Sequence, residues 1–235
     1  MASLRNIRPG HVALGAIGIG LAILLWERGS IGVGALLLLA CAVPSIILHE
    51  VSHGVVALAF GDNTAKRARR LTLNPLRHID PIGTLLLPAL LALAHLPAIG
   101  YAKPVPVNVS RLRRPRNQAV LVSLAGPATN IVIAAIAALV LRSTHHLPFV
   151  ASEVLYILGV VNTLLAVFNL IPLPPLDGSA VVERFLPARM WPGYLRLRQL
   201  ALPVLIVLVL LLPGGLRVIM NPAITLWQHA AGIPA

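Results

Sequence analysis

The stretch Ile46–Ile47–Leu48–His49–Glu50–Val51–Ser52–His53–Gly54 carries the pattern His-Glu-x-x-His inside an apolar run over residues 31–60. On a helix, residues i and i+4 share a face, so His49 and His53 can direct two imidazoles to one ion. Glu50 lies beside them, where its carboxylate could accept a proton from an attacking water. This arrangement is typical of zinc hydrolases. Because ionisable groups are costly at membrane depth, the cluster predicts a functional site within the membrane.

The composition predicts a membrane protein. Hydrophobic residues fill 57% of the 235 positions and charged residues only 11%, against about 25% in soluble domains. The net charge of +12 does not indicate nucleic acid as a partner, because the basic residues cluster in short loops between apolar runs. Aromatic residues that could stack on bases are also few. We therefore expect an all-α polytopic protein of the cell membrane, in contact with the lipid bilayer.

The apolar segments predict about five to six transmembrane helices, since a span needs about 20 residues. Basic residues at the N-terminus and in the loop after the second segment predict that the N-terminus and this loop lie in the cytoplasm. The His-Glu-x-x-His motif is then expected near the cytoplasmic side of the membrane. One segment, 82–99, contains two prolines and has basic loops on both sides. We expect it to be re-entrant or shallow, with a tilted span as the alternative. The segments are 12–26, 31–60, 82–99, 118–141, 151–175 and 199–220.

A third metal ligand is expected where segment 151–175 ends. The sequence there runs Asn169–Leu170–Ile171–Pro172–Leu173–Pro174–Pro175–Leu176–Asp177–Gly178, and its prolines interrupt a helix. Of the seven acidic residues, only Glu50 and Asp177 lie in or at the end of an apolar run at positions that can meet. Asp177 is therefore the best candidate for the third ligand. A turn residue before Gly178 is the structural alternative.

Two further features concern the scaffold. The segment 101–109 alternates small apolar residues with prolines, which favours extended backbone. We expect a rigid connector there, with an edge strand that pairs with an unwound substrate as the alternative. Asn130, in an apolar helix, is expected to hydrogen-bond to a neighbouring helix. The chain is expected to form one domain over 1–235, with a core at about 31–185 and a peripheral C-terminal helix and tail at 199–235.

Taken together, the two metal motifs resemble those of the site-2 protease family, peptidase family M50. Asn169-x-x-Pro172-x-x-x-Leu176-Asp177-Gly178 matches the second motif of that family at every fixed position. The segment Ala125–Gly126–Pro127 with Asn130 looks like the central helix of the family. The segments Leu73–Asn74–Pro75 and Ile79–Asp80–Pro81–Ile82–Gly83 look like those of a compact bacterial subgroup.

This resemblance implies a three-helix core with one Zn²⁺ per chain, bound by His49, His53 and Asp177. It implies Glu50 as the catalytic base and Asn169 as a residue that holds substrate or steadies the oxyanion. The expected activity is cleavage within or near the transmembrane segments of single-span membrane proteins. Residues 61–117 leave no room for a PDZ domain, and no CBS domain is expected after the last helix. The alternatives are a membrane metal transporter or sensor that uses the same cluster, and a scaffold without catalysis.

Overall fold

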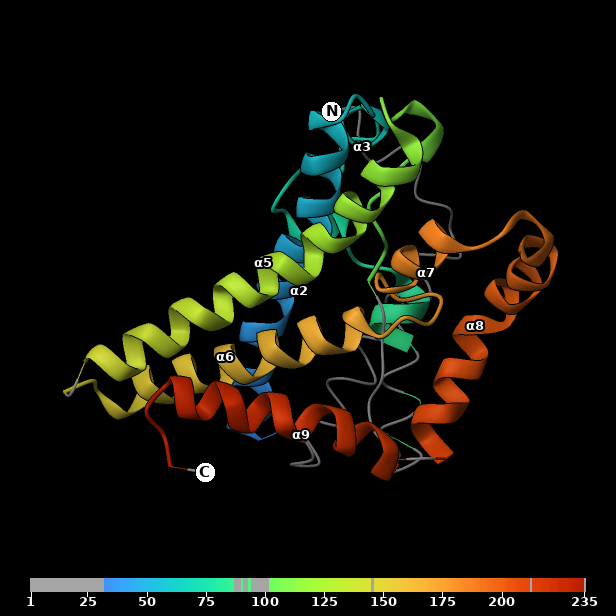
Figure 1. Cartoon of the computed structure of the whole chain (residues 1–235). Helices are drawn as coiled ribbons and strands as arrows, with labels where there is room; N and C mark the ends of the chain where they lie inside the picture. Colours follow the sequence, from blue (N-terminus) through green and yellow to red (C-terminus); the bar gives the residue numbers. More distant parts are fainter. Residues whose placement is uncertain are drawn as a thin grey trace. The chain divides into compact units, whose positions relative to one another are not determined.

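A computed structural model describes residues 32–86, 90, 93, 102–144, 146–211 and 213–234 (Figure 1). The chain forms two compact units. The larger contains Leu37–Leu73 and Val105–Ala235, and the smaller contains Met1–Leu36 and Asn74–Pro104. The described residues contain helices and no strand, which confirms the all-α prediction. The helix expected over 12–26 lies outside them.

Three described helices are long and apolar enough to cross a membrane: α2 (Val33–Ala59), α5 (Pro115–Ser143) and α6 (Phe149–Leu170). They correspond to the predicted segments 31–60, 118–141 and 151–175. The last prediction extended too far, because Pro172 and the prolines after it cannot continue a helix. In α5, Pro115 occupies the first turn, where its missing N–H costs no hydrogen bond.

Within the larger unit, α5 packs along α6, and α9 (Pro213–Ala230) covers both (Figure 1). Small side chains at this contact let the helix backbones approach closely. Trp227 of α9 inserts into it, and its indole N–H donates to the carbonyl oxygen of Ala134 at 2.8 Å. The buried cluster there consists of Ala134, Ala137, Ala138, Trp227 and Ala231.

The predicted helix 199–220 was wrong in its bounds. The structure has two helices in this region, α8 (Trp191–Leu211) and α9, which begins at Pro213. Proline cannot donate to the preceding turn, and the two glycines after it weaken a helix further. The expected tail is therefore mostly helical, and Trp227 attaches it to the core.

Short elements connect the long helices. Only part of the predicted segment 82–99 is described, chiefly as the single-turn π-helix η2 (Pro81–Leu86), so most of that prediction lies outside the described residues. Residues 102–108 have no helix or strand, in agreement with the expected connector. The other short elements are α3 (Thr64–Arg67), η1 (Pro75–Arg77), η3 (Val109–Arg111), α7 (Ser179–Phe185) and η4 (Ala188–Met190).

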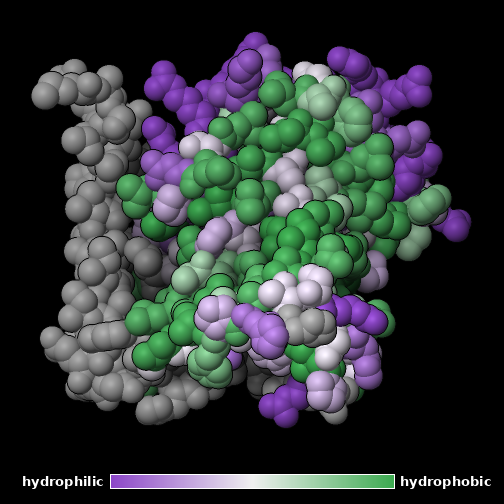
Figure 2. All heavy atoms as spheres, turned by 90° about the vertical axis from the view of Figure 1, so that its left-hand side faces the viewer, coloured by the Kyte–Doolittle hydropathy of each residue, from purple (hydrophilic) through white to green (hydrophobic). Residues whose placement is uncertain are grey.

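The outer faces of the long helices are apolar. On α5, large hydrophobic side chains such as Leu121, Ile131 and Leu139 are more than half exposed. Figure 2 shows hydrophobic side chains across the middle of one face of the molecule, with hydrophilic ones gathered mainly at its upper end. An apolar surface of this extent needs lipid or protein to cover it. Together with the span lengths, it supports a membrane protein.

Candidate metal centre

The two histidines of the His-Glu-x-x-His motif lie one turn apart on α2 and share a buried face. His49 is 6% exposed and His53 is 8% exposed. Their ring centroids are 4.8 Å apart, and the rings are nearly perpendicular. The Nε2 atom of His49 lies 3.0 Å from Oδ2 of Asp177, and that of His53 lies 3.4 Å from the same oxygen. The structure therefore brings all three expected ligands together.

Asp177 reaches the histidines because the chain turns sharply after α6. The backbone N–H of Gly178 donates to the carbonyl oxygen of Asn169 at 2.7 Å, which closes the loop. A Cβ at position 178 would lie 2.3 Å from the carbonyl oxygen of Leu170, so only glycine fits there. The Ser123 hydroxyl of α5 donates to the carbonyl oxygen of Asp177 at 3.0 Å. The position of the carboxylate is thus set by its own loop and by a neighbouring helix.

The carboxyl group of Asp177 is a good cation ligand in its ionised form. Burial by itself raises its pKa, but the favourable interactions with the adjacent imidazoles of His49 and His53 outweigh burial and lower the pKa to about 2. The group is therefore ionised at neutral pH.

Each imidazole uses its other nitrogen to bond a neighbour on α5. The Nδ1 atom of His49 lies 2.5 Å from Oδ1 of Asn130, and that of His53 lies 2.7 Å from the carbonyl oxygen of Val122. Such contacts orient metal-binding histidines and leave Nε2 for the ion. The expected contact of Asn130 with a neighbouring helix is confirmed.

The donor set fits a zinc ion. One ligand atom from each of His49, His53 and Asp177 lies within 4.8 Å of the others, the only such group of three among the described residues. The buried Nε2 of His53 has no hydrogen-bond partner. Gly126 faces both rings, and a Cβ there would lie 2.4 Å from Nε2 of His49 and 2.5 Å from Nε2 of His53. Glycine at 126 therefore leaves room beside both nitrogens. Two imidazoles and one carboxylate suit zinc.

Glu50 is held by the extended loop rather than by another side chain. Its Oε2 accepts the backbone N–H of Val105 at 2.9 Å. Pro104 and Pro106 flank Val105 and have no N–H, so Val105 supplies the only backbone donor of these three residues. One carboxylate oxygen of Glu50 is thereby tied to the loop.

The same loop is attached at a second point. Buried Asp62 accepts the backbone N–H of Asn108 at 2.6 Å and that of Thr64 at 2.9 Å. Burial raises the pKa of the Asp62 carboxyl, but the hydroxyl of Thr64 and these two N–H groups outweigh it and lower the pKa. Asp62 therefore stabilises the loop as a charged acceptor.

Asn169 is the other residue that the sequence named for catalysis. The side-chain amide of Asn169 donates to the carbonyl oxygen of Leu165 at 2.9 Å, so its contact is with its own helix. Its expected part in catalysis stays a prediction.

Sequence reasoning missed several residues around the ligands. Ser123 contacts Asp177, while Ser45 and Asn162 lie behind Asn130. An asparagine in the apolar segment 151–175 was a signal that could have drawn attention to Asn162, since amides in membrane helices usually bond another helix.

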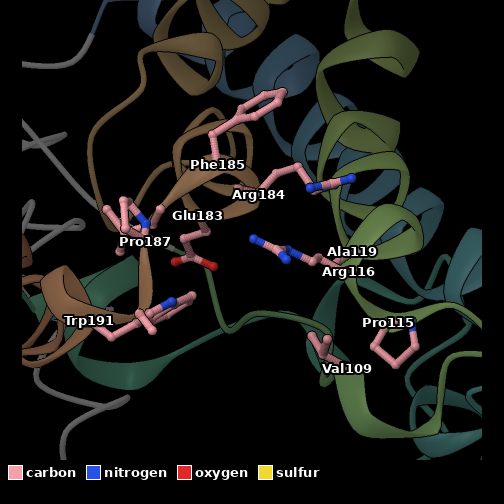
Figure 3. Close-up of a pocket in the computed structure, with 12 residues that line it drawn as sticks. Val109, Pro115, Arg116, Ala119, Glu183, Arg184, Phe185, Pro187 and Trp191 are labelled. Carbon is pink, nitrogen blue, oxygen red and sulfur yellow. The ribbon is translucent and has the colours of Figure 1, made fainter.

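A separate hollow of about 500 Å³ lies between the start of α5, α7 and η4, and it contains none of the three ligands. Figure 3 shows Arg116 and Glu183 directed into it, with Trp191 at its side. Its residues are Val109, Pro115, Arg116, Ala119, Ala180, Glu183, Arg184, Phe185, Leu186, Pro187, Ala188 and Trp191. The metal centre therefore lies outside this hollow.

Comparison with known proteins gives a consistent result. The sequence profile of Peptidase family M50 matches residues 147–212. YwhC of Bacillus subtilis (strain 168), which is named as a zinc metalloprotease, is 41% identical over 153 residues, 62% of this chain and 67% of YwhC. Rip2 of Mycobacterium tuberculosis (strain ATCC 25618 / H37Rv), also named as a zinc metalloprotease, is 32% identical over 219 residues, 87% of this chain and 82% of Rip2. No solved structure gives a significant match.

Proposed function

We propose a mechanism for this chain, which belongs to peptidase family M50 and acts as an intramembrane zinc metalloprotease. The observation that carries the proposal is the convergence of His49, His53 and Asp177 at the junction of α2, α5 and the loop after α6. These three residues would hold the zinc ion.

The residues around the ion divide the remaining work. Zinc bound there supplies a Lewis acid that acidifies water and polarises a carbonyl oxygen. Glu50 accepts the proton of the attacking water and returns it to the leaving amine. Since Val105 occupies Oε2 of Glu50, we assign the proton transfer to Oε1. Asn169 steadies the substrate or the developing oxyanion at the end of α6.

The substrates are membrane proteins, and we propose single-span proteins with a peptide bond in or near the transmembrane segment. Helical peptide bonds are shielded, so the substrate must unwind close to the metal centre. The start of α5 carries Arg114 and Arg116, and α3 carries Lys66 and Arg67. By the positive-inside rule these ends lie in the cytoplasm, which supports an active site near the cytoplasmic side of the cell membrane.

A metal transporter or sensor gains no support from the structure. A transport path needs further ligating groups along the helices, and the described residues contain a single group of three. We therefore retain the protease as the function.

The proposal is tested with Glu50→Gln in the full chain, purified in detergent. We expect zinc content by elemental analysis to stay at the wild-type level, while cleavage of a single-span reporter falls at least about 100-fold, because the general base is lost. Glu153→Gln makes the same change near the start of α6, whereas Asp177 follows the end of that helix. It is the matched control and should cleave at the wild-type rate. Wild-type cleavage by Glu50→Gln would remove Glu50 as the base.

Asp177→Ala gives the complementary result. Removing the carboxylate should lower both zinc content and cleavage, because the site then has two ligands instead of three. Unchanged zinc stoichiometry in Asp177→Ala would contradict the ligand assignment, whatever its activity.

A further inference from the structure

A continuous row of buried polar side chains runs from α2 through α6 and α5 back to the metal centre. Ser45, Asn162 and Asn130 are each at most 1% exposed. Oγ of Ser45 lies 2.8 Å from Nδ2 of Asn162, and Oδ1 of Asn162 lies 2.7 Å from Nδ2 of Asn130. The row ends at Nδ1 of His49, which lies 2.5 Å from Oδ1 of Asn130. A polar row at membrane depth is costly unless every member has a partner.

The hydrogen bonds of this row have one consistent direction, which the carbonyl oxygen of Leu158 determines. That oxygen can only accept, and the side chain of Asn162 lies 2.8 Å from it, so the atom facing it is the amide nitrogen. The other amide hydrogen of Asn162 goes to Ser45, whose own hydroxyl donates to the carbonyl oxygen of Cys41 at 2.7 Å. Oδ1 of Asn162 is therefore left to accept from Asn130.

The same reasoning extends to the metal ligand. Because the Asn130 amide nitrogen donates to Asn162, its Oδ1 faces His49 and can only accept. Nδ1 of the neutral His49 ring must then carry the hydrogen, and the lone pair of Nε2 is left free for the ion that Asp177 would also bind. With Asn130 reversed, its NH₂ group would face Nδ1, and the hydrogen of the neutral ring would move to Nε2.

We propose that Asn162 and Ser45 are positioning residues of the metal centre, which set the tautomer and ring orientation of His49 through Asn130. Neither residue touches the ion or belongs to the two metal motifs. The proposal rests on the metal site proposed above. Removing Asn162 would release Asn130 to rotate, so that His49 could no longer keep one orientation. Outer contacts of this kind typically change metal affinity 10- to 100-fold.

The test measures zinc affinity by competition with a chelator, and the absorption spectrum of the Co²⁺ form, on the full chain in detergent. For Asn162→Leu we expect zinc binding about ten-fold weaker, with a changed Co²⁺ spectrum. Ser45→Ala should weaken binding less, because Leu158 still orients Asn162, and Ser45→Thr should restore it by returning the hydroxyl. Thr163→Val is the matched control: its hydroxyl bonds Gly159 of its own helix and lies outside the row.

The outcomes separate the two proposals. The positioning role would be overturned if folded Asn162→Leu had the same zinc affinity and the same Co²⁺ spectrum as Thr163→Val. If Asn162→Leu does not fold by circular dichroism, equal affinities of Ser45→Ala and Ser45→Thr would overturn it instead. Failure of the wild-type chain itself to bind zinc would reject the metal site, and with it the basis of this inference.

Discussion

Gly126 and Gly159 lie in two regions of the same helix bundle where another side chain comes close to a glycine Cα, but the two contacts differ in kind. A Cβ at Gly126 would lie within 2.5 Å of both histidine Nε2 atoms, and a Cβ at Gly159 would lie 1.8 Å from Cζ2 of Trp227. At Gly159 the indole fills the space that the missing side chain leaves. At Gly126 the space borders two nitrogens that are needed for metal binding.

The surroundings of the two glycines differ in polarity. The metal region contains buried amides, imidazoles and a carboxylate, which are joined by hydrogen bonds. The Trp227 region is apolar apart from the indole N–H, which has a backbone acceptor in Ala134. The first region, to which we assign the chemistry, buries polar groups at a cost in desolvation, while the second supplies packing. Substitutions should therefore separate activity from stability.

Gly126→Ala should have the largest effect. Its methyl group would enter the space beside both Nε2 atoms and displace the ligands or the ion, and displacement by about 1 Å can reduce a rate about 100-fold. Zinc content and cleavage of a single-span reporter measure the result. Ala125→Gly, one residue earlier on α5, is the control. Wild-type zinc content in Gly126→Ala would contradict the contrast between the two glycines.

Val105→Pro should have the next largest effect. It removes the N–H that donates to Glu50, because proline has none. Loss of a hydrogen bond to a charged group, worth about 1.5–3 kcal/mol, should lower kcat about ten-fold or more, with zinc content unchanged. Val105→Ala keeps the N–H and serves as the control. Equal kcat values for the two variants would show that this contact does not matter for Glu50.

Gly159→Ala should act on stability instead. The added methyl group must push Trp227 out of its place, and such overpacking costs about 1–3 kcal/mol. We expect a lower temperature of thermal unfolding in detergent, together with wild-type zinc content. Loss of zinc at a temperature where Gly159→Ala is folded would mean that the two regions are coupled.

Trp227→Phe is the mildest change. It keeps an aromatic ring but leaves the Ala134 carbonyl without the indole N–H, which should cost about 1 kcal/mol of stability. Thermal unfolding of the purified variant measures the difference. Leu226→Ala, on the exposed side of α9, is the control. A Trp227→Phe variant that unfolds no earlier than Leu226→Ala would show that the indole bond contributes nothing.

Local patterns explain why the three residues of the candidate metal centre could be named from the sequence. His49 and His53 are related by helical periodicity, and Asp177 follows a run of prolines that ends a helix. The bounds of α2 and α5 followed from apolar length. The break between α8 and α9 was missed because the segment was drawn from its apolar length alone, although Pro213, Gly214 and Gly215 interrupt it.

The partners behind the ligands could not be predicted in the same way. Ser45 and Asn162 are 117 positions apart and meet only because α2 and α6 pack together. Ser45 precedes His49 by four residues and so shares its helix face, but serine is not part of the motif, and Asn162 has no spacing that relates it to the motif. The donor for Glu50 is a backbone N–H, which residue type does not reveal, although the prolines on both sides of Val105 limited the choices.

The loop at Val105–Asn108 is attached to α2 and to the turn after it through two separated contacts, at Glu50 and Asp62. A single contact would let the loop pivot about it, whereas a second contact, just beyond the end of α2, also restrains its direction. If α2 tilts or slides, the loop is carried with it, and the backbone donor keeps its place at the Glu50 carboxylate. These two hydrogen bonds therefore favour joint movement of the loop, α2 and the Glu50 carboxylate.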